Sequence, residues 1–222
     1  MLTTARSIVL AGLLTAASLS APPALAAGDP KLEATVHHLQ LAWERIKFDV
    51  PEGGKQTELM NALGVEADAT AAQFPDKVEA LIWDGIITSE RAGMAGPFSA
   101  LGLAKRARDI LEKADAMDAA ALDAGAPTSL GVLYYRVPGF PIGFGDKDKA
   151  RQLLEQAANA APNGLDAWYF YGDFLYSQNE FAKANAAFKH ALEIPVHSDR
   201  PLWDSNRRLV IQELLDKIRD KS

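Results

Sequence analysis

Apolar residues recur every three or four positions along most of the chain after residue 30, with polar residues between them. This spacing puts the apolar side chains on one face of an α-helix, because a helix turns once every ~3.6 residues. The clearest runs are Val36, Leu39, Trp43 and Ile46; Val78, Leu81, Ile82 and Ile86; and Leu103, Ala107, Ile110, Leu111 and Ala114. No convincing strand alternation competes, so the pattern predicts an all-α fold.

Helix-breaking residues fall between these runs. Asp29-Pro30 suits the start of a first helix, and the segment 51–54 suits its end. Pro75-Asp76 and the segment 93–97 mark the next two boundaries, and the segment 125–128 precedes a fifth helix. The punctuation therefore predicts a succession of helices joined by turns.

A period of 34 residues appears in the second half of the chain. Ala150, Leu154 and Ala157 each lie 34 positions before Ala184, Phe188 and Ala191, and a looser copy, Ala107, Leu111 and Ala114, lies 43 positions before the first set. In such a pattern the small residues let two helices approach closely, and the large residue fills the groove between them.

The last copy resembles the tetratricopeptide repeat (TPR) family from Leu165 to Pro195. Its first helix carries the signature residues Trp168, Tyr171, Gly172 and Leu175, and its second helix carries Ala184, Phe188 and Ala191. We expect Gly172 to let the two helices pack, and Asn179 to take the left-handed conformation at the turn. The resemblance implies a solenoid of helical hairpins, with its clearest repeats at residues 128–162 and 165–195.

A solenoid needs a polar cap at its end, and residues 201–221 suit that role. Leu202, Leu209, Val210, Leu214 and Ile218 form an apolar stripe. Acidic residues are interleaved with the cationic ones, which favours a capping helix over a basic recognition helix. We therefore expect one TPR-like domain over residues 27–222.

The first 26 residues have the features of a secretory signal peptide. Arg6 precedes an apolar run of 12 residues, and Ala24-Leu25-Ala26 supplies the small residues that a signal peptidase reads. That run is shorter than the roughly 18 residues that a membrane span needs. We expect cleavage after Ala26, a mature chain in the periplasm or outside the cell, and no membrane insertion after cleavage.

Composition narrows the functions further. The 222 residues include no cysteine, which excludes disulfides, thiolate metal sites, thiol nucleophiles and a lipid-modified N-terminal cysteine. The formal charge of −6 argues against nucleic-acid binding. Glu33 and His37 are four residues apart, but no catalytic motif surrounds them, and a solvated polar pair is the favoured interpretation. We expect no enzymatic activity, no cofactor and no metal.

Residues 138–147 form the most unusual segment, in which glycines alternate with Phe140, Ile142 and Phe144. The segment lacks the Gly-Lys-Ser/Thr ending of a phosphate loop. We expect Asp146 to cap the helix that begins at Lys147, and the three apolar residues to hold the loop over a groove left by a short preceding helix. The alternative is that they form the hydrophobic lip of a ligand cavity.

The resemblance also implies a binding face, since the first helix of each TPR lines the concave side. Five side chains of the last repeat would then face the groove: Asp166, Tyr169, Asp173, Tyr176 and Ser177. This acidic, tyrosine-rich face suits a basic or amphipathic peptide or a cationic small molecule. Alternatively, these side chains only solvate an open groove. The repeat lacks the Lys and Asn by which some TPR domains hold a C-terminal carboxylate.

Taken together, these features predict a periplasmic or secreted, non-catalytic scaffold that binds another protein or peptide of the cell envelope. The alternative is an accessory subunit of a solute transport system, because the glycine-aromatic loop is similar to that of T components of TRAP-type transporters. Such a subunit would bind a small molecule in an apolar cavity near Phe140 and Phe144.

Overall fold

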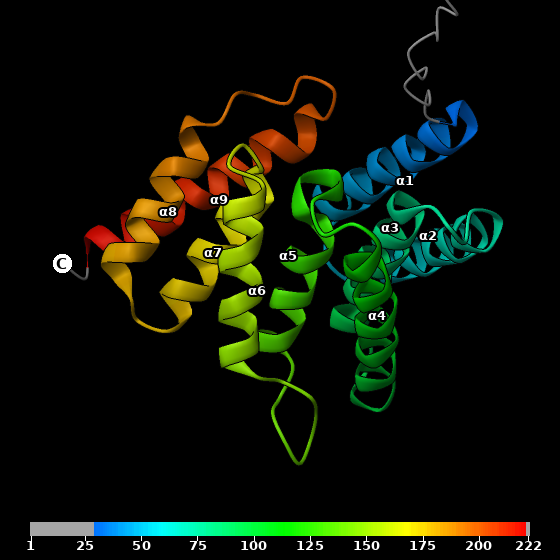
Figure 1. The fold of residues 1–222 in the computed structure, drawn as a ribbon, viewed down its shortest axis with the longest axis horizontal. Coiled ribbons are helices and arrows are strands. Elements are labelled where there is room, and N and C mark those ends of the chain that lie inside the picture. Colours follow the sequence, from blue (N-terminus) through cyan, green and yellow to red (C-terminus); the bar gives the residue numbers. More distant parts are fainter. Residues whose placement is uncertain (1–28, 221–222) are drawn as a thin grey trace, which may run out of the picture.

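The computed structural model describes residues 29–220, which fold into nine helices without a β-strand. Figure 1 shows them as a curved stack, as the all-α, TPR-like interpretation predicted. They are α1 (Pro30–Phe48), α2 (Gly54–Gln73), α3 (Val78–Met94), α4 (Pro97–Met117), α5 (Ala121–Arg136), α6 (Lys147–Ala160), α7 (Leu165–Ser177), α8 (Phe181–Glu193) and α9 (Pro201–Arg219). The expected signal peptide lies outside the described residues. Within them, no helix combines the length and apolar character of a membrane span.

A glycine closes each of the three hairpins α3/α4, α5/α6 and α7/α8. A Cβ atom on Gly85 or on Gly131 would come within 2.5 Å of Leu111 or of Leu154, and one on Gly172 within 2.6 Å of Phe188. Side-chain carbons do not approach so closely in folded proteins, so only glycine lets the two helices of each hairpin meet at this distance. The packing role predicted for Gly172 is confirmed, and it recurs in two further hairpins.

The ends of the helices largely follow the predicted punctuation. Asp29 accepts hydrogen bonds from the backbone N–H groups at the start of α1, and Asp146 does the same at the start of α6. Asn179, between α7 and α8, has a φ of 61°, as its place in the repeat suggested. The two aspartates satisfy amides that a helix leaves without a partner at its N-terminus.

Helix α5 differs from the prediction. It begins before Gly125, with a left-handed turn in which Leu122, Asp123 and Ala124 have φ values of 49°, 55° and 57°. Pro127 then lies in the first right-handed turn, where a missing N–H costs nothing. The segment 125–128 is therefore part of the helix rather than a linker before it.

Helix α9 packs on α8 and α7 and returns to α1 (Figure 1). The backbone N–H of Trp203 donates to the buried carboxylate of Glu44 at 2.9 Å, across 159 positions of sequence. The side chain of Trp203 donates to Asp166 of α7 at 3.1 Å. The last helix thus joins the first helix to the final repeat.

The buried face of α9 is not the stripe that the sequence suggested. Trp203, Ile211 and Ile218 are buried, whereas Leu209 is 62% exposed. The helix is turned so that Trp203 reaches α1 and α7, which leaves Leu209 on the outer side. The capping helix is present, but the prediction was wrong at Leu209.

The hairpin contact predicts opposite effects for one substitution at two glycines. Gly172→Ala should destabilise the fold by about 1–3 kcal/mol, because the new methyl group overlaps Phe188. Gly102→Ala, in an open part of α4, should stabilise it by about 1 kcal/mol through better helix propensity. Thermal and urea unfolding followed by circular dichroism measure both, and equal effects would contradict the packing model.

Candidate functional site

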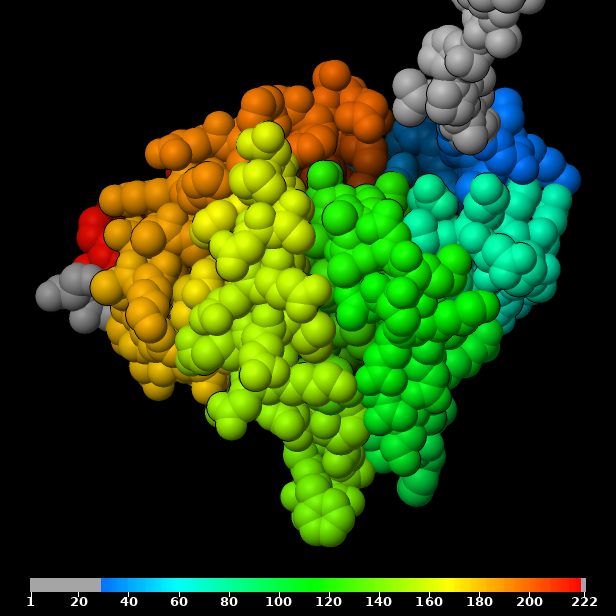
Figure 2. Space-filling view, in the orientation of Figure 1, coloured from blue at the N-terminus to red at the C-terminus, as the bar shows by residue number. Residues whose placement is uncertain are grey.

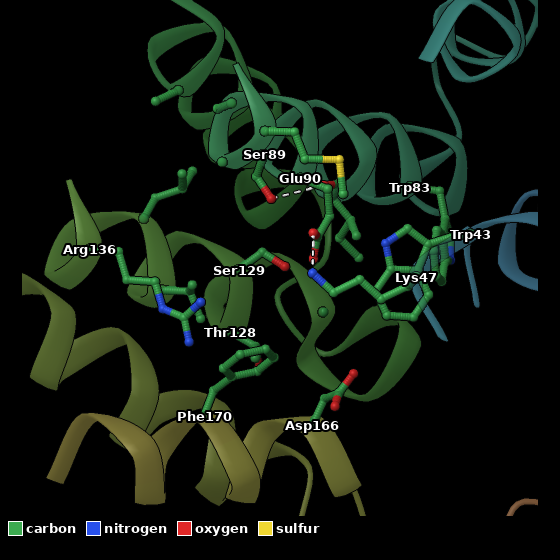
Figure 3. Close-up of a pocket in the computed structure, with 18 of the residues that line it drawn as sticks. Trp43, Lys47, Trp83, Ser89, Glu90, Thr128, Ser129, Arg136, Asp166 and Phe170 are labelled. Atoms are coloured by element: carbon green, nitrogen blue, oxygen red, sulfur yellow. Dashed lines mark hydrogen bonds and ion pairs between the residues drawn. The ribbon is translucent and has the colours of Figure 1, made fainter. Parts of the chain in front are cut away.

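A cavity of about 1070 Å³ lies on the concave side of the stack (Figure 3). The first helices of the hairpins, α3, α5 and α7, line it together with α1, parts of α2 and α4, and the start of α9 with the segment that leads into it. Helices α6 and α8 contribute no lining residue. This arrangement agrees with the expectation that first helices form the concave face.

Large aromatic side chains form much of the cavity wall. Trp43 of α1 and Trp83 of α3 meet edge to face with ring centroids 6.0 Å apart, and Trp203 of α9 lies on the same wall. Phe170 of α7 turns its ring toward the cavity from the opposite side (Figure 3). Rigid aromatic surfaces of this kind bind apolar groups at a small cost in side-chain entropy.

Charged residues on the wall are mostly paired with each other. Lys47 donates to Glu90 at 2.8 Å, and Arg207 donates to Asp166 at 2.6 Å. Arg207 also lies 4.0 Å from the ring centre of Tyr169, and its pKa is raised by Asp166 and Tyr169 despite its burial. The negative charge of Asp166 is therefore compensated within the protein.

Arg200 is the exception. Its guanidinium lies 4.5 Å from the ring centre of Trp203 and 5.3 Å from that of Trp83. Among residues 29–220 no side chain accepts a hydrogen bond from its Nε or Nη2, which are both buried. Burial lowers the pKa of Arg200, although Asp166, Glu44 and Asp199 partly oppose this effect.

Two further buried polar atoms on this wall have no hydrogen-bond partner within the described part of the chain. They are Nε1 of Trp43, whose residue is 5% exposed, and Oγ1 of Thr128, whose residue is 3% exposed. An unpaired buried donor costs free energy, so such atoms are uncommon in a folded protein. Their presence around one cavity marks it as the candidate binding site.

The residues predicted for the concave face are only partly brought together. Asp166 lines the cavity, but Tyr169 is buried beneath Arg207. Asp173 accepts hydrogen bonds from Tyr135 and Arg136 between two hairpins. Tyr176 packs on Phe181, and the exposed Ser177 donates to a backbone carbonyl of its own helix; neither residue lines the cavity.

Sequence reasoning missed Phe170, Trp43, Trp83 and Arg200. The face of α7 that meets the cavity runs through Asp166 and Phe170, one residue beyond the predicted Tyr169. The sequence shows that Asp166 and Phe170 are four residues apart and so lie on one face of a helix. It does not show that Arg207 of α9 covers Tyr169. Residues from α1 and α9 had no sequence signal that would place them on this wall.

The glycine-aromatic loop projects from the lower edge of the molecule (Figure 2). Ile142 lines the cavity, whereas Phe140 is 94% exposed. Phe144 packs edge to face on Tyr134, with the guanidinium of Arg108 4.7 Å from its ring centre. The expectation that all three residues hold the loop over a groove was therefore wrong for Phe140 and also for Ile142, which is 70% exposed.

No cluster of metal-ligating side chains occurs within residues 29–220. A carboxyl with a strongly shifted pKa lies away from the cavity: burial and the neighbouring Asp68 raise the pKa of Asp84 to about 6. Asp84 is 4% exposed and accepts a hydrogen bond from Thr88 at 3.4 Å. Because Asp84 does not line the cavity, it is a structural carboxyl rather than part of the site.

A family-model match and the similarity to one solved structure agree with the architecture. A family model described as tetratricopeptide repeat matches residues 142–203. The crystal structure of a thermophilic TPR protein from Thermus thermophilus is similar with a TM-score of 0.56 and 17% identity, over 83% of this chain and 92% of that one. A structure of MamA from AMB-1 aligns with a TM-score of 0.41 and 19% identity, over 86% and 97% of the two chains. No curated protein matches the sequence.

The raised pKa of Asp84 predicts a dependence of stability on pH. A carboxyl whose pKa is higher in the folded state stabilises the fold fully below about pH 4, and this contribution is lost as the pH rises through about 6. Asp84→Asn should therefore raise the free energy of unfolding near pH 8 by about 1 kcal/mol after allowance for solvent screening, and leave it little changed near pH 4. Urea unfolding across this range measures the effect, with the exposed Asp76→Asn as control. Parallel pH profiles for wild type and Asp84→Asn would contradict it.

Proposed function

We propose that this chain, a tetratricopeptide repeat protein, is a non-catalytic interaction scaffold of the cell envelope whose concave cavity holds a segment of a partner protein. The observation that carries the proposal is the cavity itself, which has a volume of about 1070 Å³ and three tryptophans on its wall. Tryptophan-rich, desolvated pockets at the centre of a concave surface are where binding energy concentrates in protein interfaces.

The lining helices support a binding role over a purely structural one. Each contributes residues to the cavity from its concave side, while the contacts that hold the hairpins together lie at Gly85, Gly131 and Gly172. The two sets of residues are separate. A partner can therefore occupy the cavity without disturbing the packing on which the fold depends.

The charges on the wall change the expected partner. Asp166 and Asp173 are both paired with arginines, so they do not offer the free acidic face that would attract a basic peptide. The transport alternative has less support, because only Ile142 of the three residues expected at the lip of its cavity lines the cavity. We therefore propose the protein-binding role alone.

Filling the cavity tests this role. Ser129 lines the cavity and points into it in Figure 3, and Ser129→Trp should exclude a bound segment. Ser177→Trp places the same bulk on an exposed position at the end of α7. Cross-linking of each variant in its native envelope, followed by mass spectrometry, should show a stoichiometric partner with wild type and Ser177→Trp but none with Ser129→Trp.

Both variants must retain the helical signal and unfolding midpoint of wild type for this comparison to hold. A partner that survives Ser129→Trp and is lost with Ser177→Trp would instead move the site to the end of α7, where the last residue of the predicted concave face lies. A partner retained by both variants would contradict the proposed function.

The proposed location rests on the sequence of the first 26 residues. Expression of the whole chain in a bacterium should yield a mature protein whose N-terminal residue is Ala27, recovered by osmotic shock or from the medium. Replacing Ala24 and Ala26 by bulky residues should block cleavage and leave a larger precursor. N-terminal sequencing and intact mass measure both results, and an uncleaved wild-type chain would overturn the envelope location.

A further inference from the structure

We propose that the cavity contains an anion subsite centred on Arg200, which takes a carboxylate attached to a flat apolar group. The inference deepens the proposed function and rests on it, since it names the chemistry that the concave cavity recognises. Such a group occurs in a peptide segment that joins an aromatic residue to an acidic one, and also in a free aromatic acid.

Arg200 is the one cationic residue on the described cavity wall without a carboxylate at ion-pair distance. Lys47, Arg136 and Arg207 are paired with Glu90, Asp173 and Asp166 at 2.8, 3.0 and 2.6 Å respectively. A desolvated charge without a counter-ion is costly, and proteins retain one mainly where a ligand supplies the counter-charge. The pairing pattern thus singles out Arg200 as the group that a ligand would neutralise.

Two of the three carboxylates whose charges act on Arg200 are already engaged. Asp166 accepts from Arg207 and from Nε1 of Trp203, and Glu44 accepts from the backbone N–H of Trp203. These bonds hold the two acids in place, so their charges lower the cost of burying Arg200 without saturating its donors. An arriving carboxylate would supply the counter-charge that the wall itself does not place at ion-pair distance from Arg200, which lines the cavity.

Other acidic residues on the wall do not cancel the preference of Arg200 for an anion. Glu52, Asp123 and Asp199 line the cavity but are exposed, so water and salt screen their charges. Arg200, in contrast, has Nε and Nη2 inaccessible to water. The exposed acids are screened, whereas the buried charge on the wall that lacks an ion-pair partner is positive.

The surroundings of Arg200 favour an aromatic or otherwise flat body on the ligand. Trp83 and Trp203 lie against the guanidinium, and Trp43 meets Trp83 edge to face. Trp43 and Thr128 also line the cavity, and Nε1 of Trp43 and Oγ1 of Thr128 have no hydrogen-bond partner among the described residues. A carboxylate accepts several hydrogen bonds at once, while indole faces pack well on a flat apolar group.

Arg200 is also held on a rigid element. It is the residue just before α9, where its N–H donates to the carbonyl of His197 and its own carbonyl accepts from Asp204. Asp204 is buried and binds His197 and Arg208 in turn. The backbone at Arg200 is therefore fixed before any ligand arrives, which limits the entropy lost on binding.

The charge preference can be measured with three compounds that share a phenyl ring. We expect phenylacetate to bind the wild-type protein at least tenfold more tightly than the neutral phenylacetamide, and phenethylamine to bind most weakly. Calorimetry gives the affinities, and tryptophan fluorescence reports occupancy independently, because Trp43, Trp83 and Trp203 surround the site.

Substitution assigns the effect to Arg200. Arg200→Gln should reduce phenylacetate affinity at least tenfold, to the level of the amide, and leave the affinity for phenylacetamide unchanged. Arg219→Gln removes an equally charged but exposed residue of α9, and should leave both affinities within twofold of wild type. If Arg200→Gln fails to fold, Trp43→Phe removes one unpartnered donor while keeping an aromatic ring, and should weaken phenylacetate more than phenylacetamide.

Two capped pentapeptides, one with a central Phe-Glu and one with Phe-Gln, distinguish the sources of the carboxylate. Tighter binding of the Phe-Glu peptide than of both the Phe-Gln peptide and phenylacetate supports a carboxylate on a partner protein. Tighter binding of phenylacetate than of phenylacetamide and of either peptide supports a free organic acid, and both results support the subsite.

Equal affinity for phenylacetate and phenylacetamide, or full affinity in Arg200→Gln, would overturn the subsite. If the partner protein were still lost with Ser129→Trp, the proposed function would stand without the anion subsite. Phenylacetate binding that depends on Arg200, with no partner found, would instead remove the protein-binding role and keep the subsite.

Discussion

The structure depends on close approach of two helices at a glycine, repeated in successive hairpins. Gly85, Gly131 and Gly172 each face one large apolar side chain of the second helix, and in each case a methyl group would not fit. Because these contacts recur at equivalent places, the hairpins stack with a consistent curvature and their first helices share one concave side. The cavity is the space that this curvature leaves open, so its shape derives from contacts made elsewhere.

Charge pairing between side chains then determines which charges on the cavity wall remain without a partner. The wall contains both acids and bases, but most of the bases are neutralised by acids on other helices, as Arg207 is by Asp166. A paired charge offers little to a ligand, whereas a single desolvated charge dominates the local potential. The residues on a concave helix therefore do not by themselves show which ligand charge the helix favours. Their ion-pair partners on other helices must also be known.

The fold was largely predictable because its determinants are local. Apolar spacing, the 34-residue period and the caps at Asp29 and Asp146 can all be recognised within a short stretch of sequence. Gly85 and Gly131 were missed because the connection between each glycine and its large partner differs in length among the hairpins. The left-handed turn at Leu122–Ala124 contains no glycine, and the sequence therefore did not predict its positive φ values. The site was less predictable, since Arg200 and Trp203 meet Trp83 only through the path of the whole chain.

The hydrogen bond between Glu44 and Trp203 has a consequence for how the protein matures. In an ordinary solenoid each repeat contacts only its neighbours, and a shortened array still presents most of its surface. Here the wall of the cavity needs α1, which leaves the ribosome before the other described helices, and the start of α9, which leaves it after them. A nascent chain can form its hairpins one after another, yet the proposed ligand site stays incomplete until α9 has been synthesised and docked. Proteolytic clipping before Arg200 would remove that part of the wall, so binding of the proposed ligand would report that assembly has finished.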